Sequence, residues 1–174
     1  MIAITGAAGL IGSVLSWKFN HLGKSDLVLV DQDAKNSPKW QNAKKRKFEM
    51  YLESGEFLKS LEKKEFSGKI TAVFHLGACS DTTEMDREFL RKNNTEYTQH
   101  LAEWSVANGV YFAYASSAAV YGDGALGFSD ADSLTPRLEP LNPYGQSKLD
   151  FDIWALERRL ATKITGFRYF NVYG

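Results

Sequence analysis

Tyr144 and Lys148 have the residue types and the spacing best suited to proton transfer in this chain. In a helix, residues four positions apart share one face, so the lysine ammonium would lie one turn from the phenol. A tyrosine has a reference pKa of about 10, and a nearby positive charge favours its phenolate, which can then act as a base. Asn142 and Pro143 predict the start of such a helix, as N-cap and first helical residue.

Two serines, Ser116 and Ser117, stand where a predicted strand over 111–115 ends. The carboxyl ends of parallel strands are where ligands of α/β sheets bind. A serine hydroxyl opposite the tyrosine can donate a hydrogen bond to the same substrate oxygen and orient an alcohol whose carbon gives up hydride. A Tyr-x-x-x-Lys spacing alone is weak evidence, but its position behind a strand-end serine and a glycine-rich turn predicts that Ser117, Tyr144 and Lys148 are catalytic.

The glycine-rich turn that would position this chemistry lies in the first dozen residues, where an apolar run ends in Gly6-x-x-Gly9-x-x-Gly12. This pattern is typical of a strand, a tight turn and a helix start whose backbone N–H groups approach an anion closely. A dinucleotide pyrophosphate is the usual occupant. Asp31 ends the next apolar run about 20 residues later, where a carboxylate can accept a ribose hydroxyl.

The polar and basic segment over residues 32–47 follows that carboxylate, and two interpretations of it stay open. It is either a solvated loop or a source of lysines that meet a ribose 2′-phosphate and shift preference from NAD to NADP. Further along, the small residues Gly77 and Ala78 follow a predicted buried strand over 70–76. We expect them to give the cofactor a close backbone surface.

Alternating apolar strands and amphipathic helices predict a doubly wound parallel α/β sheet of Rossmann type. A long helix is expected from about 85 to 107, and it contains Asn93 and Asn94. These amides either stay in solvent or turn inward to brace the catalytic strand. The apolar stripe expected on the helix after the glycine turn consists of Ile11, Val14, Leu15, Trp17, Phe19 and Leu22.

Composition limits the class of protein. The chain of 174 residues has 21 basic and 21 acidic side chains, so we expect small-molecule or protein partners and no nucleic acid or membrane. One cysteine, Cys79, and three histidines without ligand spacing predict no disulfide and no metal site. Glycines break the opening apolar run, so we expect neither a signal peptide nor a membrane span, and a cytoplasmic protein. The length suits one domain, 1–174.

Together, the glycine turn, the strand-end serine and the Tyr-x-x-x-Lys spacing resemble the extended short-chain dehydrogenase/reductase family of nucleotide-sugar epimerases and dehydratases. Segments 74–84, 114–119 and 166–174 are most similar to the branch that acts on C6 of an ADP-heptose. The likeness covers the whole chain. It implies an isomerase in which bound NADP transiently oxidises that carbon and returns hydride to the other face, with Tyr144 as acid/base, Lys148 as its partner and Ser117 as hydroxyl donor.

The resemblance also implies a set of ligand contacts, with NADP preferred over NAD although Asp31 is an acid. Leu76 and Ser54 stand where the family usually has a glutamate and a lysine. For the sugar, the implied contacts are Asn171 and Ser117. The implied cofactor contacts are Gly6, Gly9, Leu10, Ile11, Gly12, Asp31, Gln32, Lys39, Leu76, Gly77, Ala78, Cys79, Ser80, Asn93, Lys148 and Val172.

Other functions stay open as alternatives. A 4,6-dehydratase of this family generally has Asp-Glu after a threonine where this chain has Ser117-Ala118-Ala119, which argues against that activity, whereas a 4-epimerase is harder to exclude. A non-catalytic NAD(P)-binding sensor has no need of Tyr144 and Lys148. In the family a second catalytic lysine and a substrate domain follow the Asn-Val-Tyr-Gly motif. We therefore expect this chain to be a cofactor-binding half that is inactive alone, and the full-length protein to be a homo-oligomer.

Overall fold

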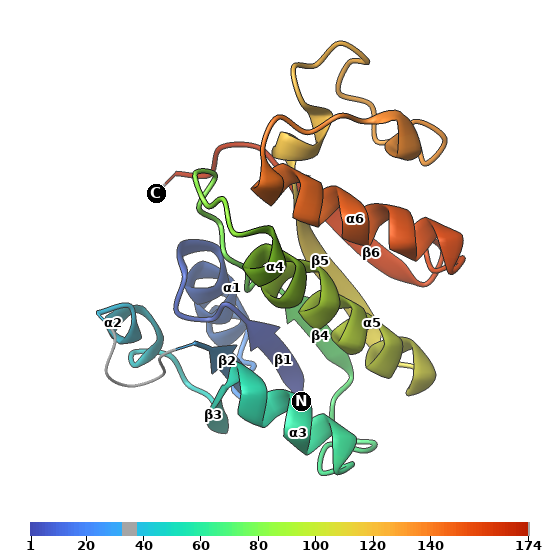
Figure 1. Cartoon of the computed structure of the whole chain (residues 1–174). Coiled ribbons are helices and arrows are strands. Elements are labelled where there is room, and N and C mark those ends of the chain that lie inside the picture. The colour runs from blue at the N-terminus through green and yellow to red at the C-terminus, as the bar shows by residue number, and fades with distance from the viewer. Residues whose placement is uncertain (33–37, 174) are drawn as a thin grey trace. The chain divides into compact units, whose positions relative to one another are not determined.

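A six-stranded sheet with the order β3-β2-β1-β4-β5-β6 organises the computed structural model, which describes residues 1–32 and 38–173 (Figure 1). β1 pairs in parallel with β2 and β4, and β2 pairs in parallel with β3. This order is that of a doubly wound dinucleotide-binding sheet, so the predicted fold class is confirmed. The strands are β1 Ile2–Thr5, β2 Leu27–Asp31, β3 Met50–Glu53, β4 Ala72–His75, β5 Tyr111–Ser117 and β6 Ile164–Tyr169.

The chain divides into two compact units, residues 1–77 with 103–113 and residues 78–102 with 114–173. In the first unit, Leu27–Val30 are fully buried, as expected for a strand covered on both faces. Ile4, Leu27 and Leu29 centre its hydrophobic core. Its helices include α1 Leu10–His21, α2 Trp40–Ala43 and α3 Ser54–Glu62. Residues 33–37 of the predicted polar segment, and Gly174, lie outside the described residues.

The predicted apolar stripe of α1 is only partly correct. Leu15 and Phe19 pack against the core, but Val14 is 53% exposed and Trp17 is 49% exposed. The buried residues of the helix are Gly12, Ser13 and Ser16. The Ser16 hydroxyl donates to the Gly12 carbonyl at 2.8 Å, which satisfies it without an external partner. Small side chains thus occupy the buried face and displace larger apolar ones outward.

The long helix predicted from about 85 to 107 is present but is not uniform. It consists of α4 Arg87–Leu90, a π-helical turn Arg91–Glu96 and α5 Tyr97–Ala107. Asp86 is its N-cap and accepts a hydrogen bond from the Phe89 N–H at 2.9 Å. Because a π turn contains more residues than an α turn, it changes which side chains face inward.

The second unit contains the helix that bears Tyr144 and Lys148, α6 Pro143–Glu157. Asn142 is its N-cap and accepts from the Gly145 N–H at 2.7 Å, which confirms the predicted start. Short 3₁₀ turns at Ala118–Tyr121 and Thr135–Arg137 complete the unit. Val120, Tyr121, Leu138 and Leu149 form its hydrophobic cluster.

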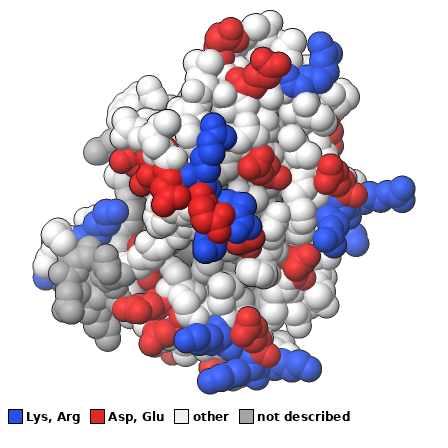
Figure 2. Space-filling model, viewed as in Figure 1, with Lys and Arg blue, Asp and Glu red and all other residues white. Residues whose placement is uncertain are grey.

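The surface carries both signs of charge close together, as Figure 2 shows for one face. Glu88 forms ion pairs with Arg91 at 2.7 Å and with Lys92 at 3.2 Å. Within residues 1–32 and 38–173, no helix combines the length and the apolarity needed to cross a bilayer. The same residues hold no cluster of three His, Cys, Asp or Glu side chains arranged to bind a metal ion.

Candidate active site

The glycine turn of the first unit is closed so tightly that side chains cannot enter it. Gly6 has a φ of +66°, and a Cβ there would lie 2.6 Å from the Gly77 nitrogen. A Cβ at Gly12 would overlap the carbonyl oxygen of Gly6. The Gly9 N–H donates to that same oxygen at 3.0 Å. The turn therefore has the bare backbone and the helix N-terminus that a pyrophosphate requires.

Asp31, at the end of β2, supports this turn directly. Its Oδ2 accepts a hydrogen bond from the Ala8 N–H at 2.8 Å, and its Oδ1 accepts from the Gln32 N–H at 2.8 Å. The carboxylate thus joins the end of β2 to the glycine turn and keeps further lone pairs for a ribose hydroxyl. Gln32 and Lys39 are exposed nearby in the sequence, on either side of the segment that is not described.

The residues after β4 also lie against the glycine turn. The Gly77 N–H donates to the Thr5 hydroxyl at 3.2 Å, and the same hydroxyl is hydrogen bonded with His75 Nδ1 at 2.6 Å. His75 is buried and stacks on Phe112, so it is a packed imidazole. The backbone of Gly77 lies directly against that of Gly6. That Gly77 and Ala78 give the cofactor a close backbone surface stays a prediction.

In the second unit, Asn94 is the amide that turns inward. Its Oδ1 accepts from the Cys79 N–H at 2.9 Å, and its Nδ2 donates to the Cys79 carbonyl at 3.0 Å and to the Ser147 hydroxyl at 3.0 Å. Thr95 donates to the Ser147 carbonyl at 2.8 Å. The π turn therefore ties the segment after β4 to the helix that carries Lys148.

Lys148 and Tyr144 are both buried on α6, with 5% and 9% of their surfaces exposed. The Lys148 Nζ donates to the Ala115 carbonyl at 2.9 Å, two residues before Ser117. Burial lowers the pKa of Lys148 to about 8, while Asp152, and Cys79 to a lesser extent, act in the opposite direction. The spacing predicted a helical pair, and the structure adds that the amine is enclosed and fixed to β5.

Ser117 stands at the end of β5, as predicted, and caps the 3₁₀ turn that follows. Its Oγ accepts from the Ala119 N–H at 3.1 Å. A Cβ at Gly145 would lie 2.8 Å from the Ala119 carbonyl oxygen, so the first turn of α6 packs directly on this segment. The structure thus brings the serine turn and the start of the tyrosine helix together.

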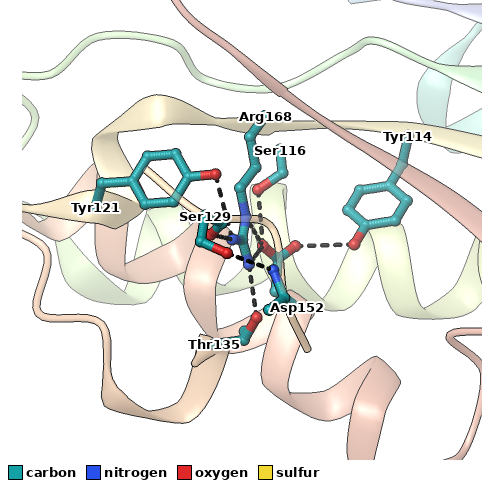
Figure 3. Close-up of polar contacts among 8 residues, drawn as sticks. Tyr114, Ser116, Tyr121, Ser129, Thr135, Asp152 and Arg168 are labelled. Carbon is teal, nitrogen blue, oxygen red and sulfur yellow. Dashed lines mark hydrogen bonds and ion pairs between the residues drawn. The ribbon is translucent and has the colours of Figure 1, made fainter. Parts of the chain in front are cut away.

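Buried Asp152 and partly buried Arg168 form an ion pair that the sequence analysis missed (Figure 3). The only available signal was the position of Asp152, one further helical turn beyond Lys148 on the same face as Tyr144. Its partners on β5 and β6 lie too far away in the sequence to be inferred from spacing.

The other predicted contacts fall into two groups. Leu10, Gln32, Lys39, Ser80, Asn171 and Val172 are exposed, whereas Ile11, Leu76, Ala78, Cys79 and Asn93 are half-buried. Asn171 and Val172 belong to the segment after β6. The roles of all these residues stay predictions.

Replacing Asn94 with alanine should destabilise the protein by about 2 kcal/mol, because the N–H and C=O of half-buried Cys79 and the buried Ser147 hydroxyl lose their bonds to this buried amide. We expect a clearly lower midpoint of thermal unfolding. Asn108→Ala is the matched control, since Asn108 is exposed and its side-chain amide donates to the Trp104 carbonyl at 2.8 Å. Equal midpoints for the two variants would contradict the bracing role.

Comparison with known proteins extends these observations. A model of the NAD dependent epimerase/dehydratase family matches residues 2–174. The ADP-L-glycero-D-manno-heptose-6-epimerase of Nitratidesulfovibrio vulgaris strain DP4 is 44% identical over 174 residues, which are 100% of this chain and 54% of that relative. The chain therefore spans about half the length of this curated relative.

Solved structures of epimerases are also similar to this chain. Helicobacter pylori ADP-L-glycero-D-manno-heptose-6-epimerase has a TM-score of 0.76 at 30% identity, covering 99% of this chain and 56% of that one. UDP-glucuronic acid 4-epimerase from Bacillus cereus in complex with NAD has a TM-score of 0.75 at 26% identity, covering 99% and 57%. Because the family model matches nearly the whole of this chain, and because these relatives agree with it, the chain belongs to the NAD dependent epimerase/dehydratase family.

Proposed function

We propose that the protein is an epimerase that inverts C6 of an ADP-glycero-manno-heptose with bound NADP. The observation that carries the chemistry is the enclosed Lys148 side chain, which donates to the Ala115 carbonyl two residues before Ser117 and lies one helical turn from Tyr144. The choice of sugar is supported by the heptose epimerases of Nitratidesulfovibrio vulgaris and Helicobacter pylori, whose names specify this reaction.

The residues of the first unit suit a dinucleotide, since only glycine fits at positions 6 and 12, where a Cβ would clash with the backbone of Gly77 and of Gly6. In our proposal the glycine turn holds the pyrophosphate, and Asp31 and Gln32 hold the adenosine ribose. Lys39 contacts a 2′-phosphate. When bound, NADP supplies reversible acceptance of hydride from C6 of the sugar.

Three side chains of the second unit would handle the sugar oxygen. Tyr144 is one of two acid/base groups that take the hydroxyl proton as the carbon is oxidised and return a proton when the carbonyl is reduced, and the resemblance implies a lysine as the other. The Lys148 ammonium favours the phenolate form of Tyr144 through its positive charge. Ser117 donates a hydrogen bond to the same oxygen and fixes its direction. Asn171 contacts the sugar.

The test is an epimerisation assay of the full-length protein, of which this chain is expected to be the cofactor-binding half. Each ADP-heptose C6 epimer is supplied as substrate, and the sugar is followed by NMR. We expect both epimers to reach one equilibrium mixture. UDP-glucose and UDP-glucuronic acid serve as competing substrates, because a 4-epimerase is the nearest alternative. Conversion at C4 of a UDP-hexose, with both ADP-heptoses unchanged, would show that the substrate assignment is wrong.

Lys39→Ala should weaken NADP binding about 10- to 100-fold, because a charge-assisted contact to the 2′-phosphate is lost. NAD lacks that phosphate, so its affinity should change less than about twofold. Calorimetric titration of the whole protein with each cofactor measures both values. Lys45→Ala, another exposed lysine of the same segment, is the control. Equal losses for NADP and NAD would contradict a phosphate contact.

A further inference from the structure

Asp152 continues the buried face of α6 that carries Tyr144 and Lys148, because the three residues follow one another four positions apart. Its side chain is 5% exposed. A buried carboxylate is costly unless it is paired and hydrogen bonded. Its partners therefore indicate what it does in this position.

The carboxylate of Asp152 is surrounded by donors from β5 and β6 (Figure 3). The Tyr114 hydroxyl donates to Oδ1 at 2.9 Å, and the Ser116 hydroxyl donates to Oδ2 at 3.0 Å. Arg168 donates to Oδ2 from Nε at 3.2 Å and pairs with it through Nη2 at 3.2 Å. The same Nη2 donates to the Thr135 hydroxyl at 2.8 Å, which fixes the guanidinium. The carboxylate is thus fully engaged within the second unit.

The two hydroxyl donors lie on either side of Ala115, whose carbonyl accepts from the Lys148 Nζ at 2.9 Å. Side chains from two successive turns of α6 therefore hold three successive residues of β5. The next residue of the strand is Ser117. Any slip of the end of β5 along α6 would move Ser117 relative to Tyr144.

We propose that Asp152 is a positioning residue that fixes the end of β5 on α6 and, through its negative charge, keeps the Lys148 side chain an ammonium. This rests on the proposed function for the roles of Ser117, Tyr144 and Lys148. Asp152 itself touches neither sugar nor cofactor in this proposal.

The electrostatic part of the proposal concerns Lys148. Burial lowers the pKa of this lysine, and the groups that raise it are Asp152 on α6 and Cys79 in the segment after β4. Burial raises the pKa of Asp152, and Arg168, Tyr114 and Ser116 act against this effect. Because the ammonium is lost as pH rises through the pKa of Lys148, removal of the Asp152 charge moves that loss to lower pH.

The experiment compares Asp152→Asn with Asp150→Asn in the whole protein and follows Lys148 by NMR titration of isotope-labelled lysine side chains. Asp150 is exposed on the same helix and accepts only from Gln146 Nε2, at 2.7 Å, among its hydrogen bonds in the described structure. We expect Asp152→Asn to lower the measured Lys148 pKa by about one pH unit. Asp150→Asn should leave it within about 0.2 of the original value, since exposed charges are screened.

Turnover provides the second readout. Asp152→Asn should lower kcat about 10-fold or more, with KM within about twofold, and move the basic limb of kcat to lower pH. Ser116→Ala keeps the charge and removes one donor, so it should lower kcat less and leave the Lys148 pKa unchanged. Tyr114→Phe should behave in the same way.

An unchanged Lys148 pKa in folded Asp152→Asn overturns the proposal. If that variant does not fold, the kcat values of Ser116→Ala and Tyr114→Phe test the proposal. An unchanged kcat in both variants overturns the positioning role of Asp152. If the unsubstituted protein epimerises no ADP-heptose, the proposed function fails instead, while the Lys148 titration still decides the electrostatic role of Asp152.

Discussion

Tyr144→Phe should lower the epimerisation rate of the whole protein by about 10²- to 10⁴-fold, the range that a positioned proton-transfer group contributes. The substitution removes only the hydroxyl and keeps the buried ring. We therefore expect the affinity for NADP and the midpoint of thermal unfolding to stay close to those of the unsubstituted protein. The measurement is kcat with the preferred ADP-heptose epimer, together with cofactor titration.

Tyr111→Phe is the control for loss of a tyrosine hydroxyl, because Tyr111 is 47% exposed at the start of β5 and its ring contact with Phe74 is retained. It should keep full activity. Undiminished turnover in Tyr144→Phe would remove Tyr144 from the mechanism. Loss of NADP affinity in parallel with kcat would instead assign the residue to binding.

Gly12→Ala should weaken cofactor binding roughly 100-fold, because the added methyl overlaps the Gly6 carbonyl and the turn has to open to admit it. Overpacking of this kind costs about 1 to 3 kcal/mol, so the unfolding midpoint should fall as well. Calorimetric titration with NADP and thermal unfolding of the whole protein measure the two effects.

Gly55→Ala is the matched control for this substitution. A Cβ at Gly55 meets no atom within 4 Å, and the residue lies in the first turn of α3. Alanine is the better helix former, so this variant should bind NADP normally and unfold at the same or a higher temperature. Normal NADP affinity in Gly12→Ala would contradict the conclusion that the glycine turn is too tightly packed to admit a side chain.

Much of the candidate site could be predicted because it depends on local rules. The glycine turn, the strand-end position of Ser117, the Asn142 cap and the helical spacing of Tyr144 and Lys148 all involve residues close in sequence. Rules of this kind need no knowledge of distant partners. For that reason the predicted fold class and the start of α6 agree with the structure.

The parts that escaped prediction depend on contacts between distant residues. An inward turn of one amide was among the open alternatives, but the partners of Asn94 were not, because Cys79 lies 15 residues earlier and Ser147 lies 53 residues later. Asp152 meets Tyr114 38 residues earlier and Arg168 16 residues later. The stripe on α1 failed for a related reason, since hydrophobicity alone does not reveal that close packing selects Gly12, Ser13 and Ser16 for the buried face.

The bond from the Ala8 N–H to Asp31 gives this carboxylate a structural role in the glycine turn that needs no cofactor. In our proposal Asp31 also binds the adenosine ribose, so a substitution at this position would change the turn and the ligand contact together. Engineering of coenzyme preference is therefore better directed at Gln32 and Lys39, which lie outside this bond. An acid at position 31 is consequently a poor guide to coenzyme choice in this chain, because the backbone of the turn uses the same carboxylate.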